Sequence, residues 1–141
     1  MGSVGLHKKG EIDLKKIIDE IKKGENFKNV GATVCFIGSV REKGLKENKV
    51  LRLEYEAYDE EAKAKLEEIR KDLLKRNGII DVSIHHVIDS LKVGEEALYV
   101  VVAGIHRKDV FPVLEEAVER VKKDVPIWKK EVTEKESYWV H

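Results

Sequence analysis

The sequence predicts a single α+β domain with a largely antiparallel sheet. Segments with the apolar spacing of helices alternate with pairs of segments that have strand character, which gives the order αββαββαββ. The length of 141 residues suits one domain with a workable core, and no internal repeat or linker divides the chain. We therefore treat residues 1–141 as one domain, with residues 1–11 as a poorly ordered or extended N-terminal segment.

Helical periodicity is confined to three segments. These segments are residues 13–23, residues 59–76, and a stretch from Asp109 to about Lys123. Asp13 and Asp109 are expected to cap the first and third helices, because aspartate at this position accepts a hydrogen bond from a free backbone N–H. Pro112 would then lie in the first turn of the third helix, where proline is tolerated.

Strand character appears in six segments. The predicted strands cover residues 31–38, 50–57, 79–88, 97–105, 128–132 and 138–140. The segment 50–57 alternates apolar and polar residues, which is typical of a half-buried strand. The segment 31–38 is apolar throughout and predicts a buried strand, so we interpret Cys35 as a core residue rather than a nucleophile.

The composition excludes several classes of protein. Lys+Arg and Asp+Glu both total 27, and this balance argues against a nucleic-acid or anionic-membrane binder. The longest apolar run, Ala97–Ile105, is too short to span a bilayer. The single cysteine excludes an intramolecular disulfide and fits a reducing cytoplasm. Any anion site must therefore be a local concentration of positive charge.

Residues 125–131 are the most informative stretch of the chain. Pro126 is expected to end the preceding helix and to restart the chain in an extended conformation. Adjacent residues of a strand point to opposite faces, so Trp128 and Lys130 share one face and Lys129 takes the other. A lysine held by a rigid turn is suited to a site that handles an anion.

Cationic residues also follow other predicted elements. Arg41 follows a strand, His106 and Arg107 follow another, and Lys122 precedes the proline turn. If they converge, they would bind a phosphate and a carboxylate-like group. A scatter of solvated charges is the alternative reading. His85–His86 lack the partner spacing of a zinc site, so we assign them a packing or surface role, with at most one facing the core.

An ordered set of short motifs resembles the large, catalytic subunit of molybdopterin synthase. The matching residues are Gly31-Ala32, Phe36 to Arg41, Leu53 to Tyr58, Val93-Gly94-Glu95, His106-Arg107 with Phe111, Lys122, Val125 to Glu131, and Trp139-Val140. The chain departs from the family pattern at Val87, where the family usually has arginine.

This resemblance implies an α/β hammerhead fold and a cytoplasmic homodimer within a heterotetramer. The partner is a small ubiquitin-like sulfur carrier whose C-terminal Gly-Gly ends in a thiocarboxylate. The complex would transfer its sulfur to cyclic pyranopterin monophosphate to make the dithiolene of molybdopterin, a step of molybdenum cofactor biosynthesis. No cofactor, metal, nucleic acid or membrane is implied.

The resemblance also assigns site residues. Lys122 and Lys129 match the family's two active-site lysines. The substrate-binding residues would be Ser39, Val40, Arg41, His106, Arg107, Lys130 and Glu131. Two other hypotheses remain open. The chain could be a non-catalytic subunit that docks a ubiquitin-like protein or a pterin, or a small anion-binding regulator unrelated to the family.

Overall fold

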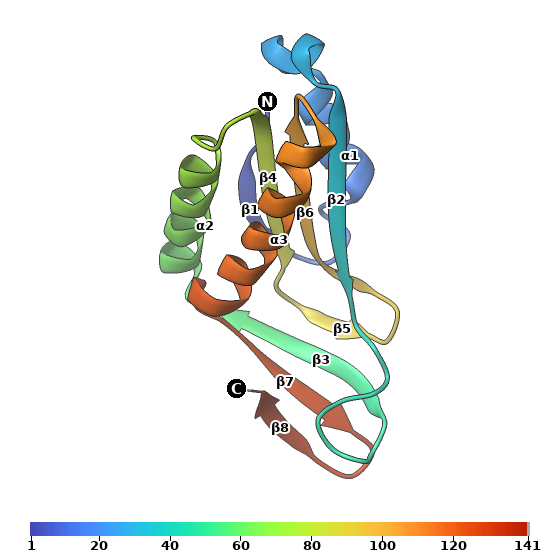
Figure 1. Cartoon of the computed structure of the whole chain (residues 1–141). Coiled ribbons are helices and arrows are strands. Elements are labelled where there is room, and N and C mark those ends of the chain that lie inside the picture. Colours follow the sequence, from blue (N-terminus) through green and yellow to red (C-terminus); the bar gives the residue numbers. More distant parts are fainter. Residues whose placement is uncertain (141) are drawn as a thin grey trace.

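A computed structural model describes residues 1–140, in which two four-stranded sheets meet end to end (Figure 1). The first sheet has the spatial order β1 (Val4–His7), β4 (Ile79–Val87), β6 (Glu96–Gly104) and β2 (Ala32–Ser39). The second has the order β5 (Ser90–Lys92), β3 (Val50–Ala57), β7 (Ile127–Thr133) and β8 (Ser137–Val140). Every strand pair is antiparallel except β1 with β4. The predicted α+β class with a largely antiparallel sheet is therefore confirmed.

Helices cover both faces of the first sheet. The helices are α1 (Leu14–Lys22), α2 (Asp59–Leu73), α3 (Arg107–Asp124) and a short 3₁₀ helix, η1 (Glu25–Asn29). Figure 1 shows α2 and α3 side by side on one face, while α1 packs against β4 and β6 from the other. The second sheet extends away from this layered body. Its strand β3 follows β2 and leads into α2, and its strand β7 follows α3.

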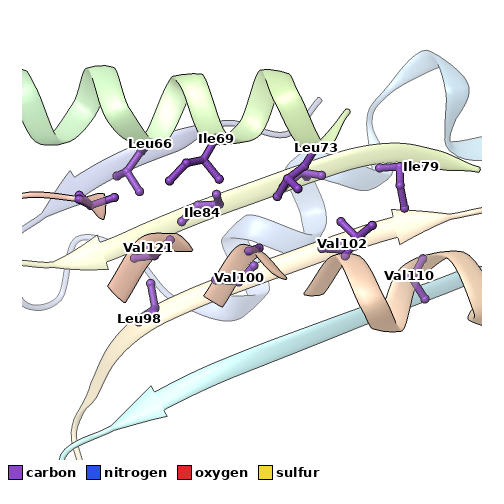
Figure 2. Packing of buried hydrophobic residues seen from close by; sticks show 14 of the residues in the cluster. Leu66, Ile69, Leu73, Ile79, Ile84, Leu98, Val100, Val102, Val110 and Val121 are labelled. Carbon is purple, nitrogen blue, oxygen red and sulfur yellow. The ribbon is translucent and has the colours of Figure 1, made fainter. Parts of the chain in front are cut away.

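The main core lies between the first sheet and the pair α2–α3. Leu66, Ile69 and Leu73 follow helical spacing along α2 and are fully buried. Figure 2 shows them above Ile84 of β4 and Val100 of β6. Because α1 and its neighbours bury the opposite face as well, β4 and β6 are buried along almost their whole length, and β6 is apolar along most of it.

Two strands and one helix start were not predicted. β1 and β5 are only four and three residues long, too short to show a period. Asp13 caps α1 as predicted, with its side chain accepting from the Lys16 N–H. The prediction that Asp109 caps α3 is wrong, because the helix begins at Arg107 with His106 as N-cap, and Pro112 consequently lies beyond the first turn.

The strand β2 is less buried than its apolar sequence predicted. It forms an edge of the first sheet, and Cys35 is exposed rather than part of the core. The two histidines of β4, in contrast, are more buried than predicted. His85 and His86 point to opposite faces, yet they are only 3% and 7% exposed, because this central strand is covered on both sides. The expectation that at most one of them faces the core is therefore wrong.

Candidate active site

A cavity of about 980 Å³ lies where the two sheets meet. Its walls come from the end of β2 and the loop 42–49 that follows, from β3, from the last turn of α3, and from β7. Its cationic side chains are Arg41, Lys43, Lys122, Lys123 and Lys129. Asp124 and Glu131 are the carboxylates in the wall, so positive charge predominates. The chain therefore has a local basic site although its formal net charge is zero.

The proline turn sets which lysine faces this cavity. α3 ends at Asp124, Val125 is extended as expected for a residue before proline, and β7 begins at Ile127. Lys129 lies opposite Tyr55 of β3 and lines the cavity together with that residue. Trp128 also touches the cavity rim, but its ring stacks edge-on against Tyr58 and remains 39% exposed. The indole is therefore only partly packed.

The environment of Lys129 lowers the pKa of its side chain. Half-burial of the side chain lowers its pKa below the usual value, and the positive charges of Lys122 and Arg41 lower it further. The carboxylate of Glu131, two residues along the same strand face, acts in the opposite direction and raises it. A lysine in this setting exchanges its proton near neutral pH more readily than a solvated one.

Lys122 approaches the same space from the last turn of α3. Its Nζ lies 5.7 Å from the centre of the Phe36 ring on β2, at the distance of a cation–π contact. The C-terminal end of a helix carries partial negative charge, which favours cations such as Lys122 and Lys123 there. Strand β2 contributes Ser39 at its end, and Arg41 follows two residues later. The cavity thus gathers cations from three separate elements.

Two of the predicted substrate-binding residues face elsewhere. Lys130 points to the opposite face of β7, where its Nζ lies 3.5 Å from a carboxylate oxygen of Glu54 and 5.2 Å from the centre of the Trp139 ring. Val40 is buried in a second hydrophobic core, which also contains Ile17 and Ile21 of α1. Its backbone forms hydrogen bonds with Gly94 and Glu95. Neither residue lines the cavity.

The His106–Arg107 pair lies at the other end of α3. Lys122 lies fifteen positions after Arg107, which corresponds to about 22 Å along the helix. His106 is exposed, and its Nδ1 is 3.5 Å from a carboxylate oxygen of Asp109. Within one chain, this pair therefore does not share the cavity with the two lysines.

Sequence reasoning missed several wall residues. Lys43 lies in a polar loop that contains no motif, and Lys123 does not match the family motif that includes Lys122. His86 is the clearest omission. Burial lowers its pKa to about 4, which leaves the ring neutral at pH 7, and its Nδ1 is 2.9 Å from the carbonyl oxygen of Val87. Burial also raises the pKa of Tyr55 to about 12. The alternation on β3 was the signal that could have located Tyr55.

The cavity suits binding of anions and proton transfer. Among residues 1–140, no group of three or more His, Cys, Asp or Glu side chains is arranged to hold a metal ion. Over the same residues, the structure contains no helix with both the length and the apolar character needed to cross a membrane. A half-buried lysine beside four other cations can position anionic groups and stabilise charge that develops on them.

Comparison with known proteins identifies the family. The model of the family described as "MoaE protein" matches residues 7–124. The molybdopterin synthase catalytic subunit of Pyrococcus abyssi is 39% identical over 137 residues, which cover 89% of this chain and 92% of the relative. The same subunit of Bacillus subtilis is 37% identical, covering 94% and 81%. The crystal structure of molybdopterin synthase from Staphylococcus aureus matches with a TM-score of 0.87 and 37% identity, over 100% of this chain and 98% of that one. The chain therefore belongs to the MoaE protein family.

Proposed function

We propose that this chain is the catalytic subunit of a molybdopterin synthase. It transfers sulfur from the C-terminal thiocarboxylate of a small ubiquitin-like subunit to cyclic pyranopterin monophosphate, which produces the molybdopterin dithiolene. The observation that carries this proposal is Lys129, a half-buried lysine with a lowered pKa in a cavity whose wall contains four further cations. Residues 1–141 act as one domain in the cytoplasm, in keeping with a single unpaired cysteine.

The cations answer a specific electrostatic problem of this reaction. The substrate carries a phosphate and the sulfur donor is itself an anion, so the two repel each other before sulfur attacks carbon. Fixed positive charges from Arg41, Lys122 and Lys129 offset this repulsion and hold both groups in one place. Because the site is partly shielded from water, these charges act more strongly than they would at an open surface.

The two lysines have different roles. Lys129 positions the thiocarboxylate and aids proton transfer, since its lowered pKa makes it give up a proton more easily than a solvated lysine does. Lys122, at the helix end, stabilises the charge that develops on the substrate. Ser39 and Arg41 bind the pterin and its phosphate from the end of β2. The Gly-Gly tail of the partner has no side chains, which suits entry into a cavity with walls on several sides.

The chain works as a homodimer within a heterotetramer. This arrangement gives His106 and Arg107 a role that a single chain does not allow, because they lie about 22 Å along α3 from Lys122. In the dimer, the pair binds the phosphate of a substrate held in the cavity of the second chain. Substitution of Arg107 in one chain of a mixed dimer should then weaken the cavity of the other chain.

Reconstitution tests this proposal. The purified chain is mixed with a thiocarboxylated small subunit and cyclic pyranopterin monophosphate, and dithiolene formation is measured alongside complex formation. Product that depends on all three components is the expected result. Docking of the small subunit without product would instead make the chain a non-catalytic binding subunit. Neither docking nor product would leave an anion-binding protein of another kind.

A further inference from the structure

The carboxylate of Glu131 joins the paired strands β7 and β8 to a loop that is distant in sequence. Its Oε1 accepts the backbone N–H of Leu45 at 3.0 Å and the hydroxyl of Tyr138 at 2.7 Å. Glu131 itself belongs to β7, Tyr138 to β8, and Leu45 to the loop 42–49. The residue is only 7% exposed, and both hydrogen bonds are partly buried. One oxygen atom therefore ties the loop to the second sheet.

Gly44 permits this close approach. A Cβ atom at this position would lie 2.4 Å from Glu131 Oε1 and 2.5 Å from Val50 Cγ2, both far inside contact distance. Only glycine lets the loop backbone come close enough for the Leu45 N–H to reach the carboxylate. The hydrogen bond from Leu45 to Glu131 therefore depends on glycine at position 44.

Polar contacts, rather than apolar packing, hold the loop. Leu45 is 67% exposed and buries little surface. Besides the bond to Glu131, Lys46 places its Nζ 4.3 Å from the centre of the Tyr138 ring and 3.2 Å from a carboxylate oxygen of Glu136. Both of these contacts are at the surface, where ion pairs contribute little. The buried carboxylate of Glu131 is the strongest attachment of the loop.

The loop carries cations into the cavity wall. Arg41 lies at its base, and Lys43, Gly44 and Leu45 line the cavity together with Lys122. If the loop detached from β7, Lys43 would leave the wall and Arg41 would lose a fixed neighbour. The position of the loop therefore decides how many cations a bound phosphate meets.

We propose that Glu131 is a positioning residue that latches the loop 42–49 over the cavity, so that Arg41 and Lys43 are held against the substrate phosphate. This inference rests on the proposed function and replaces the expected substrate-binding role of Glu131. Direct contact fits poorly, because a carboxylate repels both a phosphate and a thiocarboxylate. One of its oxygens is, in addition, already occupied by two donors.

Four variants in the reconstituted complex test the latch. Glu131→Ala removes the acceptor, Glu131→Gln keeps an acceptor oxygen, and Gly44→Ala pushes the loop away without changing any charge. Glu134→Gln, at an exposed residue after β7, is the control. We expect Glu131→Ala and Gly44→Ala to raise KM for the cyclic pterin about tenfold, with kcat changed less than about threefold. Glu131→Gln should lie between these variants and the wild type.

Two further measurements separate a latch from a contact with the substrate. Amide hydrogen exchange over residues 42–49, without substrate, should be faster in Gly44→Ala and Glu131→Ala than in the control. The pH profile should shift in both Glu131 variants, since its charge raises the pKa of Lys129, but not in Gly44→Ala. Wild-type KM and wild-type loop exchange in Gly44→Ala would overturn the latch. If even the wild-type complex made no dithiolene, the proposed function would fail, and loop exchange would still decide the latch.

Discussion

Adjacent lysines on β7 offer a matched test of the proposed mechanism. Lys129 and Lys130 have the same chemistry and neighbouring positions, but Lys129 lines the cavity, whereas Lys130 pairs with Glu54 on the opposite face. The perturbation is the pair of single variants Lys129→Ala and Lys130→Ala. Any difference in activity between the two variants then comes from the strand face that each lysine occupies, because both variants lose one lysine.

The structure sets the size of the expected effect. Loss of a side chain that positions a reactant and transfers a proton lowers kcat by about 100- to 10,000-fold. Four cations remain in the wall without Lys129, so binding of the pterin should survive and KM should change less than about threefold. Lys130 contributes a partly exposed ion pair, which is worth at most about 1 kcal/mol of stability. Its replacement should leave kcat within about threefold of the wild type.

Single-turnover dithiolene formation is the appropriate assay, because it isolates chemistry from product release. Lys129→Arg adds a second comparison. It retains the positive charge but cannot give up its proton, so its rate should stay close to that of Lys129→Ala. A Lys129→Ala enzyme with a near wild-type rate would refute the role of Lys129. Equal losses in both alanine variants would refute the argument from the strand face.

Three other predictions follow from the packing and the titrating groups. Lys122→Met removes a cation beside Lys129, so the pKa of Lys129 should rise; an NMR titration of the Lys129 side chain that showed no rise would contradict this. Leu66→Ala in the main core should lower the free energy of unfolding by about 2–5 kcal/mol in urea denaturation, and a loss below about 1 kcal/mol would contradict the packing. His85 and His86 have pKa values of about 4 in the folded chain against 6.5 when unfolded, so the unfolded state binds more protons between these values. Stability should therefore fall from pH 7 toward pH 4, by up to about 1.4 kcal/mol per pH unit for each histidine, and an unchanged urea midpoint at pH 5 would contradict this.

Periodicity predicted the long elements of the fold because their own sequences carry the signal. The strand β3 was predicted with the bounds that the structure shows, since Leu53 and Tyr55 alternate with charged residues. The edge position of β2 was not predicted, because an apolar strand looks the same in the middle of a sheet and at its border. Exposure of Cys35 follows from that position. Which strands are neighbours depends on contacts between distant segments, and no local pattern records them.

The candidate site shows the same division. Alternation placed Lys129 and Lys130 on opposite faces, and the structure has them there. The loop latch escaped prediction because Gly44 and Glu131 are far apart in sequence and meet only after β3 pairs with β7. His86 escaped because burial on both faces of β4 removes the alternation that would reveal an inward side chain. The order of the motifs indicated candidate site residues. Their separation along α3 shows that His106 and Arg107 do not share a cavity with Lys122 in one chain.

The short interval between Lys122 and Lys129 explains why these two lysines meet. A continuous helix would turn residue 129 onto the same face as residue 122 but carry it about 10 Å further along the axis. Pro126 prevents this by ending α3, and the chain continues as the strand β7 from Ile127. The carbonyl of Pro126 accepts the N–H of Tyr58 at 3.3 Å, which fixes the start of β7 against β3 and so fixes which side of the strand Lys129 takes. The proline therefore sets both the separation of the two lysines and the face from which the second one enters the cavity.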